Sequence, residues 1–198
     1  MTTARVRPET YLHTALEAVR NKPHWQMVLD ELPVPIYMTD AEGAVTYWNQ
    51  ECVIFAGRQP ELGRDRWCVT WQLYTTTGER LLHEKCPMAE AITKRREVRG
   101  EVAIALRPDD SRRAFTPYPT PLFDTAGNLT GAVNMLIDVT DEQASVLDEQ
   151  ASRCKRLAKA VDDKTTSQIL SNMAEGYAAT ATALKSSGDV YPDKAPSL

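Results

Sequence analysis

The sequence is poor in the features that mark membrane, secreted and fibrous proteins. No apolar run approaches the roughly 20 residues that span a bilayer, and the first twenty residues are too polar for a signal peptide. Its four cysteines form no CxxC pair, and it has only 9 glycines among 198 residues. These absences exclude transmembrane, disulfide-stapled and collagen-like proteins, so we expect a cytoplasmic protein with reduced thiols.

The chain also lacks a large excess of charge of either sign. The chain has 23 basic and 27 acidic residues, a net charge of −4 at pH 7. So mild an acidity gives no extended positive surface for nucleic acid or anionic lipid, and we expect neither a nucleic-acid nor a membrane partner. The hydrophobic fraction of 42 % is ordinary for a soluble protein, and the length suits one domain of about 100–150 residues with additions.

Catalytic and metal-binding motifs are missing as well. The sequence contains no P-loop, no nucleophile elbow and no HExxH. No histidine follows His83, so the later helices lack the phosphoacceptor that a histidine kinase needs. A zinc site built from His83, Cys86, Cys68 and Glu84 lacks the usual paired spacing. We therefore expect neither an enzyme nor a metal site.

Helical periodicity marks both ends of the chain. Residues 1–28 are predicted as an N-terminal helical extension, with Thr10 as a helix cap. Residues 142–185 carry two apolar stripes at 3–4 spacing, separated by a break at 162–165 whose aspartates suit a helix start. This pattern predicts a helical hairpin. The tail, 186–198, has no periodicity and is predicted to be disordered.

The middle of the chain has the alternation of strands. A hairpin is predicted from Ile36–Asp40 and Ala44–Asn49, with Gly43 at a turn position that needs a positive φ. Short helices follow over 50–90. Three further strands are then predicted, at 98–106, 112–120 and 131–139. The result is a five-stranded antiparallel α+β domain over 29–141.

Three prolines punctuate the fourth of these strands. Pro117, Pro119 and Pro121 recur at every second residue, so their missing N–H groups face one side of the strand. We expect this stretch to extend beyond its neighbour on that side.

Several short motifs resemble those of the PAS domain, a family of small sensory modules. They are the segment Leu32-Pro33-Val34-Pro35-Ile36-Tyr37-Met38-Thr39-Asp40, then Gly43, Trp48-Asn49, Leu62-Gly63-Arg64 and Asp138-Val139-Thr140. The stretch after residue 106 is similar to PAS sensors attached to bacterial histidine kinases, although Asp110 stands where glycine is expected. The resemblance implies a ligand site on the sheet face under the short helices. It also implies that Asp138 and Thr140 pass a signal into the following helix.

Alternation along the last strand separates its two faces. Asn134 and Leu136 share one face, which the resemblance identifies as the ligand face. Trp67, Trp71 and Tyr118 are the other candidates for lining a pocket. An alternative for Asn134 is that its amide satisfies a buried backbone group.

The opposite face of the last strand is too apolar to remain in water. Its residues and those of the N-terminal stripe form a predicted interaction face: Val133, Met135, Ile137, Leu12, Leu16 and Val19. The N-terminal helix or a second copy of the chain would cover it. We expect a homodimer through this face and the flanking helices. The competing outcome is a monomer whose C-terminal hairpin folds over its own sheet.

Few residues in the sequence are candidates for binding a cofactor. His83 and Cys86 are candidate haem ligands, because haem-binding PAS sensors use histidine and Cys-Pro pairs bind haem in some regulators. The alternative is a structural loop with Pro87 at the start of a helix. A flavin photosensor of the LOV subclass needs a reactive cysteine in a different context from that of Cys52. We therefore expect no cofactor, with haem as the lesser alternative.

Together these features predict a stand-alone cytosolic PAS sensory or adaptor protein of bacterial signal transduction. A small molecule of unknown identity or a partner contact would rearrange the flanking helices. A histidine kinase or a response regulator is the expected partner. The rival interpretations are a ligand-free constitutive interaction module and a haem-binding redox or gas sensor.

Overall fold

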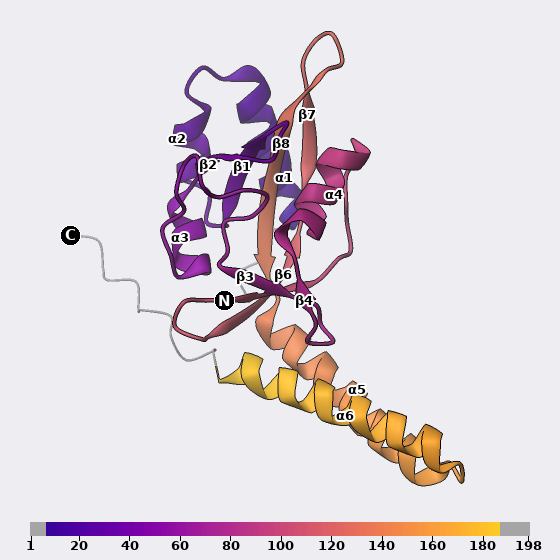
Figure 1. The fold of residues 1–198 in the computed structure, drawn as a ribbon. Coiled ribbons are helices and arrows are strands. Elements are labelled where there is room, and N and C mark those ends of the chain that lie inside the picture. The colour runs from indigo at the N-terminus through magenta and orange to yellow at the C-terminus, as the bar shows by residue number, and fades with distance from the viewer. Residues whose placement is uncertain (1–6, 187–198) are drawn as a thin grey trace, which may run out of the picture.

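The computed structural model describes residues 7–186, which form one antiparallel sheet flanked by helices (Figure 1). The helices are α1 (Pro8–Asn21), α2 (Trp25–Asp30), α3 (Gln50–Ala56), α4 (Pro87–Lys94), α5 (Thr140–Ala160) and α6 (Lys164–Lys185), with a 3-10 turn, η1 (His83–Lys85). The strands are β1 (Ile36–Asp40), β2 (Val45–Trp48), β3 (Gln72–Tyr74), β4 (Arg80–Leu81), β5 (Ala103–Leu106), β6 (Arg112–Pro117), β7 (Thr120–Phe123) and β8 (Leu129–Asp138).

The sheet confirms the predicted fold class and extends it by one hairpin. Its order is β2-β1-β8-β6-β5-β3-β4, and β7 also pairs with β8. The predicted strand 112–120 is divided into β6 and β7, which follow one another along β8. The β3–β4 hairpin lies within 50–90, where only short helices were predicted, so the expectation of five strands was too low.

The proline pattern explains where β6 and β7 lose their second neighbour. The amide of Tyr118 donates to the carbonyl of Met135 on β8 (2.8 Å), so the three prolines at alternating positions turn their nitrogens away from β8. On that side β5 pairs no further than Ala103 with Phe115. The prediction that this stretch extends beyond its neighbour is confirmed.

Two turns depend on left-handed backbone. Gly43 has φ +85°, and a Cβ there would lie 2.2 Å from the ring of Trp67, so the position requires glycine. Asp40 closes the same turn by accepting from the amides of Glu42 (3.0 Å) and Ala44 (2.8 Å). Asp110, the departure from the PAS pattern, also has a positive φ of 64°, which aspartate tolerates better than most residues.

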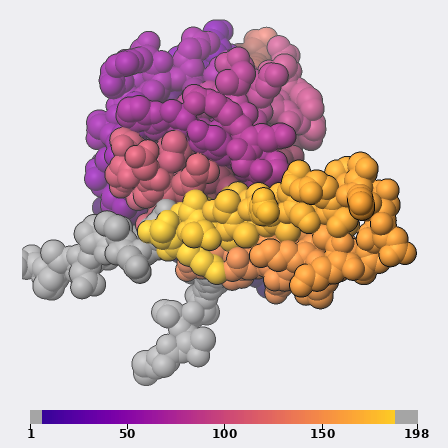
Figure 2. Space-filling view, turned by 60° about the horizontal axis from the view of Figure 1, so that its bottom comes forward, coloured from indigo at the N-terminus to yellow at the C-terminus, as the bar shows by residue number. Residues whose placement is uncertain are grey.

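The two faces of the sheet are covered by different helices. One face, here called the inner face, packs against α3 and α4. On the outer face, α1 and α2 cover Val133 and Met135, which are fully buried. The α5–α6 hairpin covers Ile104 and Ala114 of β5 and β6 and projects from the lower end of the sheet (Figures 1 and 2). Of the two covers proposed for Val133 and Met135, the structure has the N-terminal helix of the same chain.

The helix ends follow local chemistry, with one correction. Asp163 caps α6 by accepting from the amide of Thr166 (2.7 Å), as the break at 162–165 predicted. Thr10 does not cap α1, because the helix already begins at Pro8, which is favoured in a first turn. The predicted disordered tail lies outside the described residues except for Ser186. Over residues 7–186 no helix combines the length and apolarity that crossing a membrane requires.

Candidate functional site

The inner face is organised around Tyr37 of β1. Its buried hydroxyl donates to the carbonyl of Trp67 (2.9 Å) and accepts from the amide nitrogen of Asn134 (3.0 Å). The amide oxygen of Asn134 accepts from the backbone N–H of Tyr118 (2.9 Å). Both ends of the Asn134 side chain are thus paired within the chain, which is the arrangement that the backbone-satisfying interpretation predicted.

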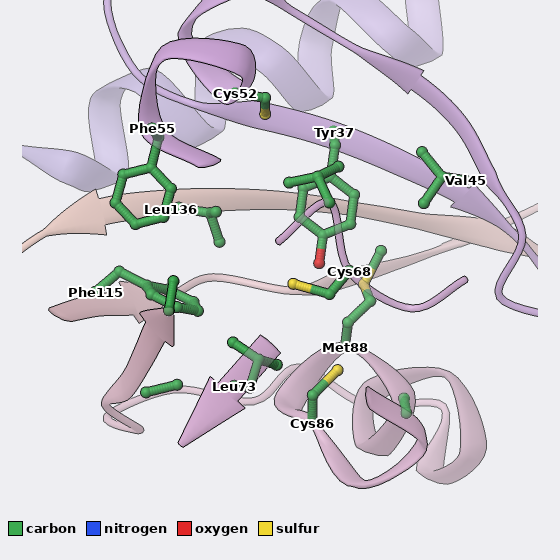
Figure 3. Packing of buried hydrophobic residues seen from close by; sticks show 14 of the residues in the cluster. Tyr37, Val45, Cys52, Phe55, Cys68, Leu73, Cys86, Met88, Phe115 and Leu136 are labelled. Carbon is green, nitrogen blue, oxygen red and sulfur yellow. The ribbon is translucent and has the colours of Figure 1, made fainter. Parts of the chain in front are cut away.

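Side chains of this chain occupy the space under α3 and α4 (Figure 3). The largest are Tyr37, Phe55, Leu73, Met88, Phe115 and Leu136. Phe55 and Phe115 meet edge to face with their ring centroids 5.5 Å apart. Leu136 lies on the predicted face and is fully buried there. The region where the resemblance places a ligand is therefore a packed core.

The remaining pocket candidates do not gather at this core. Trp67 packs against it. Trp71 is 52 % exposed, and Tyr118 belongs to the outer-face cluster, with the Arg99 guanidinium 5.4 Å from its ring. Trp71 and Tyr118 therefore do not join Asn134 and Leu136 at the inner core. One lies in a loop outside the sheet, and the other points to the opposite face.

Three buried thiols line the inner core. Cys52, Cys68 and Cys86 are free and almost fully buried. Burial raises the pKa of Cys86 from 9.0 to about 12 and raises the pKa of Cys52 well above the same ordinary value. These groups are protonated at neutral pH and buried, so they lack the accessible thiolate that nucleophilic attack requires.

The two candidate haem ligands face different regions. The Sγ of Cys86 lies in the inner core, 3.8 Å from the carbonyl oxygen of Trp67. His83 lies on η1 and lines a surface pocket of about 480 Å³ with Arg58, Asp65 and Trp71. Burial lowers the pKa of His83. Cys86 is enclosed by other side chains of the inner core, and His83 lines a pocket open to the surface, so neither residue faces an enclosed apolar site that fits haem.

Metal-ligating side chains are likewise dispersed. Over the described range, 7–186, no three His, Cys, Asp or Glu side chains come together in a way that would hold a metal ion. The residues considered for a zinc site do not gather either. Cys68 and Cys86 lie in the inner cluster, whereas His83 and Glu84 do not belong to it.

The junction between β8 and α5 is held by a group of polar contacts. Asp138 accepts from both the amide (2.9 Å) and the hydroxyl (2.5 Å) of Thr140. The same hydroxyl accepts from the amide of Ala114 on β6 (3.1 Å). Arg113, whose side chain is 6 % exposed, lies 3.5 Å from the other oxygen of Asp138. These contacts fix the first turn of α5 to the adjacent strand, at the residues predicted to transmit a signal.

The hairpin also docks on the sheet beside this junction. Leu147 of α5 and Leu184 of α6 are fully buried against Ile104 and Ala114. Only this proximal part of the hairpin belongs to the cluster. Leu157, Ile169 and Met173, farther along, remain exposed, and so does Val146, which lies beside Leu147 but points away from the sheet cluster. The hairpin thus has a docked end and an unpartnered end.

Two residues of the site were missed by sequence reasoning. Tyr37 was quoted only as part of a motif, and Arg113 was not singled out. A tyrosine between apolar residues in a predicted buried strand signals a hydroxyl in need of a partner. Nothing in the sequence identified Trp67 and Asn134 as those partners, because 30 and 97 positions separate them from Tyr37.

Comparisons with known proteins agree with this architecture. A family model described as "PAS fold" matches residues 29–144, more than half of the chain. Among curated proteins, no sequence matches.

Similar solved structures include three PAS or LOV proteins. The LOV protein of Rhodobacter sphaeroides is 13 % identical, with 92 % of this chain and 100 % of that chain covered and a TM-score of 0.46. The LOV domain of a blue-light activated histidine kinase from Erythrobacter litoralis is 20 % identical over 55 % of this chain and 98 % of that chain, with a TM-score of 0.43. The PAS domain of the fruit-fly ELK potassium channel is 10 % identical over 58 % and 93 %, with a TM-score of 0.45. On the strength of the family match over residues 29–144, the chain belongs to the PAS fold family.

Proposed function

We propose that the chain is a sensory or adaptor module of bacterial signal transduction whose output is the position of the α5–α6 hairpin. The observation that carries this proposal is the junction at Asp138 and Thr140. There the last strand of the sheet leads directly into α5, and a few hydrogen bonds tie the helix to β6.

The input is a change at the inner core or at its helical cover. Asn134 and Asp138 lie on the same strand, and Asn134 is bonded to Tyr37 and through it to the carbonyl of Trp67. A ligand or partner that displaces Trp67 would alter these bonds and shift β8 relative to β6. Since packed interfaces tend to switch between discrete arrangements, the hairpin would then undock or re-dock as a unit.

The hairpin is the proposed contact with other proteins. Its exposed apolar side chains suit a second copy of this chain or a histidine kinase or response regulator. We propose a homodimer as the resting form. The chain acts by binding rather than by catalysis, so incubation with labelled ATP and Mg²⁺ is expected to leave it unlabelled.

A second candidate function is a constitutive interaction module with no small-molecule input. The packed inner core favours it, since Phe55, Phe115 and Leu136 fill the face where a ligand would lie. A thermal-shift screen against metabolites separates the two functions. A ligand at 100 times its Kd raises the stability of a sensor by about 2.7 kcal/mol, whereas a ligand-free module shows no such shift.

Hydrogen exchange of the variant Thr140→Val tests the proposed output. Valine keeps the shape of threonine and removes the hydroxyl that joins Asp138 to the amide of Ala114. We expect faster exchange in the first turns of α5 and in the docked end of α6, with the inner core unchanged. Thr182→Val is the matched control, because that exposed hydroxyl bonds only to its own helix. Equal exchange in the two variants would show that this junction does not hold the hairpin.

A further inference from the structure

A small pocket lies at one end of the central strands, where the linker before β1 meets the end of β8. Its volume is about 150 Å³. The side chains that line it come from three segments: Pro33, Val34, Pro35, Glu51, Ile54, Phe55, Leu136, Ile137 and Asp138. The pocket is thus bounded by the α2–β1 linker, by α3 and by the last residues of β8, beside the filled core rather than within it.

Hydrogen bonds hold the walls of the pocket in place. The amide of Leu136 donates to the carbonyl of Pro35 (2.9 Å), which fixes the linker to β8. On the other side, Arg107 donates to the carbonyls of Ile54 (2.6 Å) and Phe55 (2.8 Å) at the end of α3. The pocket is therefore preformed, and a ligand entering it has no loop to order.

The lining combines an apolar interior with negative charge. Seven of its nine residues are apolar, and Leu136 and Phe55 are buried. The other two are carboxylates, Glu51 and Asp138, and the lining contains no basic side chain. Both oxygens of Asp138 are already engaged, one by Thr140 and the other by Arg113, so the carboxylate left for a ligand is that of Glu51, which has no ion pair among the residues that the structure describes. A cation is the ligand charge that this pocket favours.

We propose that this junction pocket binds a small ammonium ion carrying a short alkyl chain. The alkyl chain would lie against Leu136, Phe55 and Ile54, and the ammonium group would lie at the carboxylate of Glu51. A cavity of about 150 Å³ holds a molecule of about six heavy atoms, which matches a primary amine of four or five carbons. This proposal concerns binding alone and does not depend on the signalling role proposed above.

Titration with n-butylammonium chloride tests the proposal. The full chain, labelled at isoleucine, leucine and valine methyl groups, is followed by NMR at constant ionic strength. We expect saturable shifts of the Ile54, Leu136 and Val34 methyl signals at ligand concentrations up to about 20 mM, a range suited to so small a ligand. The uncharged isostere n-butanol and the anion butyrate, which have the same number of carbons, are expected to bind at least about fivefold more weakly, because they lack the positive charge that the Glu51 carboxylate attracts.

Two variants and a control complete the test. Glu51→Gln removes the carboxylate from a half-buried position in the first turn of α3 and is expected to weaken butylammonium binding about fivefold or more. Ile54→Trp fills the pocket and is expected to abolish the shifts. Glu79→Gln, in the β3–β4 turn outside the pocket, is expected to change nothing.

The proposal fails under any of three results. These are the absence of saturable shifts in the wild type, equal binding of n-butanol and butylammonium, and equal binding by Glu51→Gln and wild type. If Ile54→Trp does not fold, the Glu51→Gln comparison decides the question alone. If the ligand binds but hydrogen exchange in α5 does not change, the binding proposal holds. That result would count only against a role for this ligand in signalling.

Discussion

At the scale of single residues, the hydroxyl of Tyr37 links two segments of the inner core by hydrogen bonds. Tyr37→Phe would leave the carbonyl of Trp67 and the amide nitrogen of Asn134 without this partner in a buried site. We expect a loss of about 1–3 kcal/mol in the free energy of unfolding, measured by urea denaturation. Tyr47→Phe is the control, because that hydroxyl bonds Asp30 at the surface and its loss is expected to cost less than about 1 kcal/mol. Equal losses would mean that the Tyr37 hydroxyl contributes nothing specific.

The buried thiol of Cys86 makes stability depend on alkaline pH. Its pKa rises from 9.0 to about 12 on folding because burial disfavours the thiolate. The neutral thiol therefore contributes its full stability below pH 9, and this contribution is lost as pH rises from 9 toward 12, where the unfolded thiol ionises. We expect Cys86→Ala to reduce the slope of unfolding free energy against pH in this range by up to about 1.4 kcal/mol per unit. Unchanged slopes would contradict the assignment.

The face on which a side chain lies could be predicted where apolar and polar residues alternate regularly. Elsewhere the prediction failed. Alternation along β8 correctly separated Asn134 and Leu136 from Met135, because each successive side chain in a strand points to the opposite face. Trp71 lies in a loop, where no period fixes the direction of a side chain. Tyr118 lies between two prolines at the break between β6 and β7, so sequence alone did not show which face it joins.

At the scale of elements, long periodic segments were predicted better than short ones. The break between α5 and α6 was placed correctly, because Asp163 caps the second helix with its own side chain. The β3–β4 hairpin was missed. Its strands have three and two residues, too few for alternation to be seen, and pairing with β5 rather than local preference holds them in the sheet.

Docking of the hairpin depends on a few buried side chains at its proximal end. Leu147→Ala would leave a cavity against Ile104 and Leu184, and we expect a loss of about 2–5 kcal/mol in the stability of the hairpin. Because α5 and α6 hold few other contacts with the sheet, the loss is expected mainly as faster amide exchange in both helices. Leu157→Ala is the control, since this side chain is 44 % exposed on the same helix. A uniform loss across the whole chain would show that the hairpin and the sheet unfold together.

At the scale of the whole molecule, the structure moves the expected site of self-association away from the outer face of the sheet. Met135 was predicted at the centre of a dimer face, but α1 and α2 bury it completely within one chain. Met135→Glu would place an unpaired charge in that core, so we now expect it to unfold the protein rather than to separate a dimer. Loss of the circular dichroism signal on heating, at a temperature well below that of the wild type, would distinguish unfolding from dissociation.

The exposed apolar side chains of the hairpin lie on one side of it. On α5, Val146 and Leu157 each come one residue before a buried position. On α6, Ile169 and Met173 each come one residue before a more buried position. One residue is a turn of about 100° about a helix axis, and since the two helices run antiparallel, the same offset brings both pairs to the same side. An apolar strip of this kind suits a second hairpin.

Self-association through this strip is the last prediction. Burying each large apolar side chain contributes about 1.5–3 kcal/mol, so four from each of two chains can offset the entropy of association. We expect the wild type to scatter light as a dimer at micromolar concentration and the double variant Ile169→Glu, Met173→Glu to scatter as a 22.1 kDa monomer with its helix content retained. Met27→Glu is the control, because Met27 is 69 % exposed but lies on α2, away from the hairpin, and it is expected to leave the dimer intact. A wild type that remains monomeric at high micromolar concentration would end the dimer hypothesis, and dissociation by Met27→Glu would move the interface to the N-terminal helices.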